Sequence, residues 1–130
     1  MKLELTYLVW VTVLTALLWI PYILDRIMVW GLPDTVGYPE NPQPQSPWAR
    51  RMRSAHANAV ENLVIFAALV LAAQAAGVSN STTVLACTLY FWARLVHLFA
   101  YTFALPWIRT LTFAVGFVCQ LALAWQLLAR

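Results

Sequence analysis

Charged residues are scarce in this sequence: 8 Lys and Arg together with 5 Asp and Glu make up 10% of its 130 residues. A soluble domain carries roughly 25% charge, so this deficit argues against a water-soluble globular protein. Hydrophobic residues form 62% of the chain, and the mean hydropathy is +0.71. The sequence therefore predicts an integral membrane protein. The net charge of +3 does not indicate nucleic-acid binding, because the Arg residues lie near expected helix ends, where membrane orientation explains them.

Cysteine pairs and metal-ligand patterns are also missing. The two cysteines, Cys87 and Cys119, each lie in an apolar stretch, and there is no C-x-x-C pair. Buried cysteines in such stretches behave as small hydrophobic residues, so we expect no disulfide. No spacing of His and Cys is typical of a metal site, and we predict no metal cofactor.

Long apolar segments are what the chain has instead. A helix needs about 20 residues to cross a hydrocarbon core of about 30 Å. The first segment exceeds the 7 to 15 apolar residues of a signal-peptide core, at roughly 20, so we expect it to be a retained span. The four candidate spans, which predict a single domain over residues 1–130, are residues 5–24, 49–76, 82–105 and 106–128.

Short connections between these spans predict an all-α, up-down bundle of four transmembrane helices. Gly77 suits the position just past a helix end, and one of residues 79–81 suits the cap of the next helix. Pro106 suits the first turn of the last helix. Residues 25–48 are rich in Pro, Gly and Asn, so we expect a surface loop there, with a lid over a site as one possible role.

Basic residues predict how the bundle is oriented. With four spans, the first and third connections lie on the same side of the membrane. The positive-inside rule places the more basic side in the cytoplasm, which leaves both termini outside; in a bacterium this is the inner membrane. The predicted cytoplasmic side carries Arg26, Arg50, Arg51, Arg53 and Arg109, against Lys2 and Arg130 on the other side.

Polar residues inside the second span indicate a site within the bilayer. A charge in lipid costs from about 3 to more than 10 kcal/mol unless it finds a partner. Asn58 and Glu61 are three residues apart and so share a helix face. Glu61 lies about 12 Å along the helix from Arg53. The chain is therefore expected to have a polar site at this depth.

The third span adds a second row of polar side chains. Arg94, His97 and Tyr101 follow an i, i+3, i+7 spacing that places them on one face, and Arg109 opens the next span. All of them are expected in the cytoplasmic third of the bundle. Because Arg binds carboxylates through a two-pronged fork, a small, multiply charged, peptide-like anion fits this set of residues.

Each of these residues also has a purely structural interpretation. Glu61 and Arg94 can form an ion pair between helices with no ligand role. The basic residues at the start of the second span can be interfacial anchors. His56 can simply be solvated at the headgroup level. His97 can be a hydrogen-bonded packing residue. Tyr101 can be an interfacial residue whose hydroxyl contacts water.

Two stretches resemble the family of membrane-associated proteins in eicosanoid and glutathione metabolism (MAPEG), and bacterial members like microsomal glutathione transferases most closely. Residues 51–62 are similar to the family pattern Arg-x-x-Arg-Ala-His-x-Asn-x-x-Glu-Asn. The second stretch is Arg94-x-x-His97-x-x-x-Tyr101 followed by Pro106-x-x-Arg109. The length, the four spans and the long first loop agree with the family as well.

The resemblance implies a homotrimer that holds glutathione between neighbouring subunits near the cytoplasmic face. Two positions depart from the family: Ser54 replaces an Arg, with Arg53 adjacent, and Phe113 stands where some members have Tyr. Arg109 would lie near the sulfur, with a hydroxyl from Thr110 or Tyr101 assisting. The glutathione-binding residues that the resemblance implies are Arg51, Arg53, Asn58, Glu61, Arg94, His97, Tyr101 and, as a further contact, Arg26.

The chemistry implied is thiolate catalysis. A thiol with a pKa of about 8.5 is mostly protonated at neutral pH, and a nearby guanidinium favours the thiolate. The expected enzyme is a membrane glutathione transferase that conjugates or reduces lipophilic electrophiles and hydroperoxides, with glutathione as co-substrate. The alternative is a non-catalytic membrane scaffold of the same fold that binds lipids or a partner protein, because a fold does not settle an activity.

Overall fold

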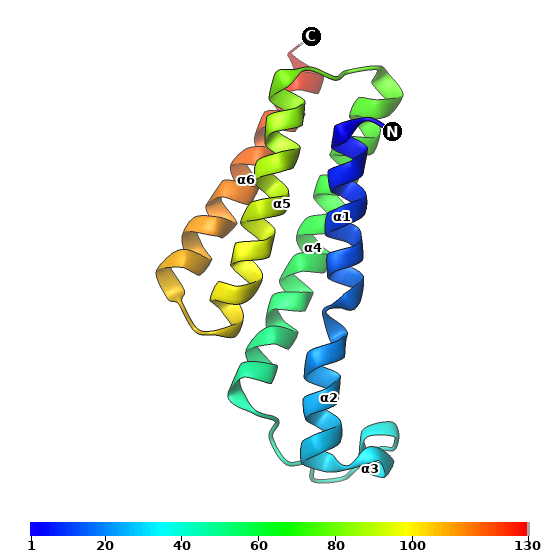
Figure 1. Ribbon diagram of the computed structural model, residues 1–130, viewed down its shortest axis with the longest axis vertical. Coiled ribbons are helices and arrows are strands. Elements are labelled where there is room, and N and C mark those ends of the chain that lie inside the picture. The colour runs from blue at the N-terminus through cyan, green and yellow to red at the C-terminus, as the bar shows by residue number, and fades with distance from the viewer. Residues whose placement is uncertain (130) are drawn as a thin grey trace.

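The computed structural model describes residues 1–129, so Arg130, which entered the orientation prediction, lies outside the described residues. Four helical segments in this range have the length and apolar composition of membrane spans, and no strand occurs within it. This confirms the predicted all-α, four-span bundle (Figure 1). The helices are α1 (Leu3–Leu17), α2 (Trp19–Trp30), α3 (Leu32–Val36), α4 (Pro47–Ala76), α5 (Ser81–Thr102) and α6 (Pro106–Leu128).

The first span consists of two helices, α1 and α2, that are separated at Leu18 (Figure 1). Pro21 has no N–H to donate to the carbonyl of Leu17, and its ring crowds that carbonyl, so the helix cannot continue unbroken. The amide of Leu18 instead donates to Thr15 O at 3.3 Å, a tighter i to i−3 bond.

The span then runs six residues past its expected end at residue 24. The polar pair Asp25 and Arg26 suggested a loop, but no helix breaker occurs before Gly31, whose φ of 80° ends α2. The connection to the second span is therefore shorter than the expected loop over residues 25–48, and it contains the short helix α3.

Local capping residues form the turn between α4 and α5 as predicted. Gly77 adopts the left-handed conformation with φ 70°, and the amide of Val78 donates to Ala73 O at 2.8 Å, which closes the end of α4. Asn80 caps α5, because its Oδ1 accepts from the amide of Thr83 at 3.0 Å. Pro106 occupies the first turn of α6, which is also as predicted.

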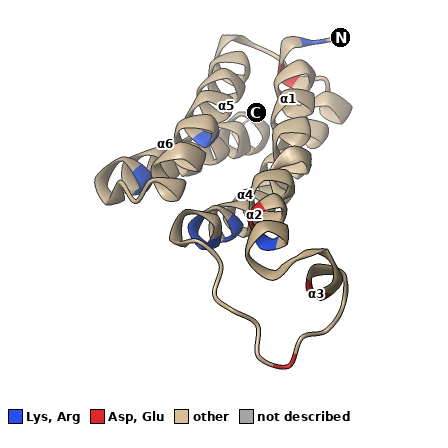
Figure 2. Ribbon diagram, turned by 60° about the horizontal axis from the view of Figure 1, so that its bottom comes forward, with Lys and Arg blue, Asp and Glu red and all other residues tan. Residues whose placement is uncertain are grey.

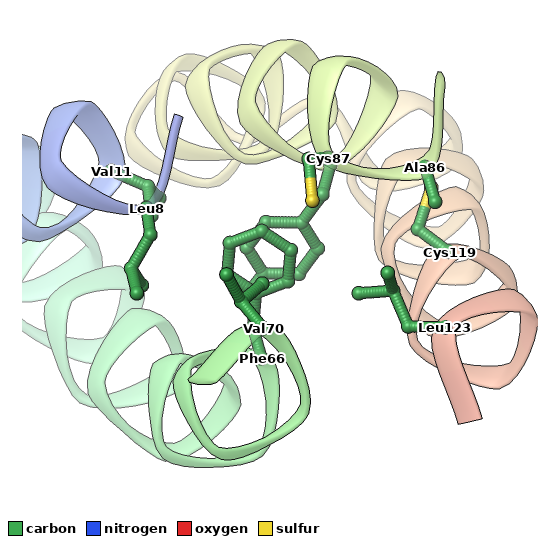
Figure 3. Packing of buried hydrophobic residues seen from close by; sticks show 9 residues of the cluster. Leu8, Val11, Phe66, Val70, Ala86, Cys87, Cys119 and Leu123 are labelled. Carbon is green, nitrogen blue, oxygen red and sulfur yellow. The ribbon is translucent and has the colours of Figure 1, made fainter. Parts of the chain in front are cut away.

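Helix α5 is the centre of the bundle and packs against α1, α4 and α6. Buried side chains from α1, α4, α5 and α6 converge on one apolar cluster (Figure 3). Within it the rings of Phe66 and Tyr90 stack with centroids 3.8 Å apart. Gly116 on α6 faces the ring of Tyr90 and the stem of Arg94, so α5 and α6 approach closely at this point. In lipid such van der Waals packing is a main force between helices.

Helices α2 and α4 project beyond the connection between α5 and α6 (Figure 1). The first span has 28 residues and α4 has 30, against 22 in α5. At 1.5 Å per residue, the two longer elements reach about 42 to 45 Å, which exceeds a hydrocarbon core of about 30 Å. The end of α2 and the beginning of α4 therefore extend out of the apolar layer, together with α3.

Candidate functional site

Arg94 lies inside the bundle, where 4% of its surface is exposed, and its partner is an amide. Its Nη2 donates to Oδ1 of Asn58 on α4 at 2.8 Å. Asn62, one turn further along α4, donates to the carbonyl oxygen of Asn58 at 2.9 Å. Gln120 on α6 donates to the carbonyl oxygen of Asn62 at 3.2 Å. These four residues, which we call the amide network, join α4, α5 and α6 around one guanidinium charge.

Glu61 lies beside this network but does not pair with Arg94. Its side chain is exposed, and no ion pair involving it forms among residues 1–129. It lies ten residues along α4 from Arg51, or about 15 Å. An uncompensated carboxylate at such a depth in a bilayer is costly. The structure thus does not support the structural ion pair between Glu61 and Arg94.

Arg51 ties the beginning of α4 to the end of α5. Its Nε donates to the carbonyl oxygen of Thr102 at 2.8 Å, and Thr102 is the last residue of α5. A cation at this position also interacts favourably with the negative end of the helix dipole. This bond uses Nε, and no hydrogen bond from the two terminal nitrogens of Arg51 occurs within residues 1–129. Arg53 is exposed on the same helix.

Arg109 and Tyr101 come together at the junction of α5 and α6. The guanidinium of Arg109 lies over the ring of Tyr101, 5.2 Å from its centroid, which is a cation–π contact. Arg109 is exposed and Tyr101 is half-buried. The hydroxyl of Thr110 donates to Pro106 O at 2.9 Å, so its proton is already engaged in a local bond. Tyr101 is therefore the more available hydroxyl donor of the two.

His97 faces the interior of the protomer. It is 2% exposed, its Nδ1 has no hydrogen-bond partner among the described residues, and it lines a small void together with Thr15 and Arg94. Its ring contacts the rings of Tyr101 and Phe113 at centroid distances of 5.7 and 6.3 Å. This placement favours packing behind the site, and a direct contact between His97 and glutathione stays a prediction.

Arg26 lies apart from these residues, in the extension beyond α5. Its Nε donates to Oε1 of Gln45 at 3.2 Å, and its guanidinium lies 4.9 Å from the centroid of the Trp30 ring. The protomer itself thus brings Arg94 to Asn58 and Arg109 to Tyr101, but it leaves Arg26 bound to its own loop. Figure 2 shows basic positions on the first turns of α4 and on α6.

Several polar contacts escaped the sequence reasoning. The i, i+4 spacing of Asn58 and Asn62 could have indicated their bond, because side chains at that spacing meet. Gln120 carried no local indication, since its partner is on another helix. His56 is half-buried, and its Nδ1 is bonded to the hydroxyl of Tyr22 at 2.7 Å, so it is not simply solvated.

An apolar groove between α4 and α6 adjoins the amide network. Its walls are aliphatic and aromatic side chains, and Asn62 and Gln120 provide its polar part. An apolar molecule in the bilayer can approach the polar residues along such a groove. The apolar lining residues include Val64, Ile65, Leu69, Phe113, Phe117 and Leu121.

Comparison with known proteins gives one family. The sequence profile of the MAPEG family matches residues 7–129, which is nearly the whole chain. Microsomal glutathione S-transferase 1 of Homo sapiens is 38% identical over 79 residues, and the protein of the same name from Bos taurus matches equally well. These matches cover 60% of this chain and 51% of each relative, so the chain spans about half the length of the curated relatives it matches. No solved structure matches the chain.

Proposed function

The chain belongs to the MAPEG family, and from that membership we propose that it is a membrane-bound glutathione transferase acting on lipophilic electrophiles. The names of the relatives support the glutathione part of the proposal. The charged groups of Arg94, Arg51 and Glu61, together with the amides around Arg94, support it independently. A peptide with two carboxylates and one ammonium group needs cations, an anion and amides within reach of one another.

The observation that carries the proposal is the bond between Arg94 and Asn58, beside an exposed Glu61. Arg94 has a neutral partner, so its charge is available to a carboxylate of glutathione. Glu61 is available to the ammonium group, and the free nitrogens of Arg51 to a second carboxylate. Each of these charges is unneutralised within the described part of the chain, and one ligand would neutralise them together.

A second copy of the chain would complete this site. The exposed carboxylate of Glu61 faces away from its own protomer, and a charge exposed to lipid is costly. We therefore keep the homotrimer, with glutathione between neighbouring subunits, as part of the proposal. The side of the membrane is proposed from the Arg distribution, with the site near the cytoplasm.

Arg109 is assigned to the sulfur in this proposal. A guanidinium next to a thiol lowers the pKa of that thiol and favours the thiolate. The cation–π contact with the ring of Tyr101 positions Arg109. The thiolate attacks an electrophilic carbon, a C–S bond forms, and the electron pair leaves with the leaving group or takes a proton from water. With a lipid hydroperoxide, two glutathione molecules give the disulfide, an alcohol and water.

The lipophilic substrate is proposed to come from the bilayer along the groove between α4 and α6. The groove is lined mostly by apolar side chains, and Asn62 and Gln120 of the amide network are part of its wall. This arrangement gives a reason for placing the reaction in a membrane, since the electrophile never has to enter water.

The test is the ultraviolet difference spectrum of the detergent-solubilised protein on adding glutathione, with Arg109→Ala in parallel. A thiolate band near neutral pH that the variant loses supports the proposal. Saturable binding by calorimetry without a thiolate band contradicts the catalytic part and favours a glutathione-binding protein with no activated sulfur. If neither a band nor binding is observed, the non-catalytic lipid- or partner-binding scaffold replaces the proposed enzyme.

A further inference from the structure

Asp25 is a buried carboxylate whose hydrogen bonds all lead to the beginning of α4. It lies on α2 with 6% of its surface exposed. Its Oδ1 accepts from the hydroxyl of Ser46 at 2.5 Å, and its Oδ2 accepts from the amide of Ser46 at 3.1 Å and from Nε2 of Gln45 at 3.2 Å. Ser46 is the residue that caps α4, and its own hydroxyl makes no capping bond. Asp25 thus holds both donor groups of this residue.

Neighbouring contacts extend this attachment along the loop. Nε2 of Gln45 also donates to the carbonyl oxygen of Tyr22 at 2.8 Å. The indole of Trp30 donates to the carbonyl oxygen of Gln43 at 2.5 Å. The segment just before α4, residues 43–46, is therefore fixed to α2 by several hydrogen bonds. We call Asp25, Gln45 and Ser46 the clasp.

The charge of Asp25 is compensated without a direct ion pair. The positive end of the α4 dipole lies at Ser46, and a carboxylate at that end is stabilised by typically 0.3–1 kcal/mol, and by up to about 2 kcal/mol when partly buried. Gln45 also connects the carboxylate to Arg26, which donates to the Oε1 of Gln45. A buried charge that is satisfied in this way makes the position of Ser46 highly specific, because any displacement leaves the carboxylate unsatisfied.

Ser46, the N-cap of α4, lies five residues before Arg51. Arg51 in turn reaches the last carbonyl of α5 through its bond to Thr102. Two points of α4 are therefore fixed, one to α2 and one to α5, and the proposed glutathione residues follow directly on this helix. Loss of the attachment to α2 would let the beginning of α4 shift or fray, and this would move the guanidinium of Arg51.

We infer that Asp25 is a positioning residue of the glutathione site: through Ser46 it sets where the first turns of α4, and with them Arg51, stand relative to α5. This inference rests on the proposed function. Asp25 does not touch the ligand in this assignment. Its contribution is to keep a cationic group at a fixed place, since a small misplacement of a binding group costs affinity steeply.

The test compares Asp25→Ala with Asp25→Asn and with the control Asp34→Ala. Asp34 is an exposed acid in the same connection, so its replacement changes the net charge equally without touching the clasp. Hydrogen exchange of the Ser46–Arg50 amides and the kinetics of glutathione conjugation are measured on each variant. We expect faster exchange in Asp25→Ala only, together with a rise of about tenfold in KM for glutathione and a change in kcat below about twofold. Asp25→Asn keeps an acceptor for Ser46 and should recover most of the KM.

The outcomes separate the inference from the proposed function. Unchanged exchange in Asp25→Ala overturns the inference whatever the activity. If the amides of Asp25→Ala exchange faster but its KM for glutathione is unchanged, or if only kcat falls, the positioning role is overturned and the proposed glutathione transferase activity is unaffected. If the wild-type protein neither binds nor turns over glutathione, the proposed function fails and the inference fails with it. If Asp25→Ala does not fold, Ser46→Ala decides, since it removes the hydroxyl bond to Asp25 but leaves the amide bond, and it must then raise both the exchange of the first α4 amides and the KM for glutathione, whereas wild-type values for both overturn the inference.

Discussion

Arg94 on α5 places its Nη2 atom 2.8 Å from Oδ1 of Asn58 on α4, so a buried guanidinium is paired with a neutral amide. A neutral partner satisfies the geometry of the guanidinium without neutralising it. The charge is therefore held in place and is still available to an anion.

The first prediction concerns that pair. Asn58→Asp would convert the hydrogen bond into an ion pair, so the thermal stability of the protein should be kept or raised. Its glutathione affinity should fall by at least about tenfold, or 1.4 kcal/mol, because the new carboxylate competes for Arg94. Calorimetric titration and thermal unfolding in the same detergent check both parts. Wild-type affinity in the Asn58→Asp variant would remove Arg94 from the ligand site.

The second prediction concerns the exposed carboxylate. Glu61→Gln keeps the shape of the side chain and removes its charge. Because Glu61 has no ion pair within residues 1–129, the protomer should lose no stability. Glutathione affinity should fall by about tenfold if Glu61 binds the ammonium group, since a charged hydrogen bond contributes about 1.5–3 kcal/mol. Glutathione lacking its amino group should bind the wild type and the variant equally.

The third prediction tests how α6 supports Arg94. An added Cβ at Gly116 would lie 3.7 Å from the Tyr90 ring and 3.8 Å from the Arg94 stem, which are ordinary contacts. Gly116→Ala should therefore keep stability or raise it by up to about 1 kcal/mol, because Ala has the higher helix propensity. Gly116→Leu should cost about 1–3 kcal/mol through overpacking and should also weaken glutathione binding, because it displaces Arg94. Equal effects of the two substitutions would show that the close approach is unimportant.

The fourth prediction concerns the link between α2 and α4. Tyr22→Phe removes the hydroxyl that bonds Nδ1 of His56 at 2.7 Å. A half-buried imidazole nitrogen would then lack its partner, so the protein should lose about 1–2 kcal/mol of stability. Chemical unfolding measures this loss. His56→Phe in the Tyr22→Phe background should recover part of it, and a double-mutant cycle with no coupling energy would contradict the bond.

Features set by neighbouring residues were predictable from the sequence. The left-handed Gly77, the capping Asn80 and the first-turn Pro106 each depend on residues within one helical turn, and each is found as predicted. The four spans follow from length and apolar composition in the same way. Such features need no knowledge of which helices are neighbours.

Features that depend on partners distant in the sequence were not predictable. Asp25 and Arg26 were interpreted as the end of a span, because charged residues directly after an apolar run usually mark a loop. The structure instead satisfies Asp25 from residues 20 and 21 positions away, which lets α2 continue to Trp30. Gln120 likewise is paired 58 residues away. The partner of Glu61 was not predictable either, because helical periodicity and depth in the bilayer do not show which group lies against an exposed side chain.

The break at Leu18 also divides the bundle mechanically. One apolar cluster contains Leu8 and Val11 of α1, and a second contains Tyr22 of α2 with the first turns of α4. A continuous helix would couple the orientations of the two clusters rigidly, whereas the break at Leu18 lets each helix follow its own packing partners. The cluster around Leu8 and Val11 and the cluster that carries Tyr22 and the first turns of α4 thus belong to two separate rigid segments of the first span.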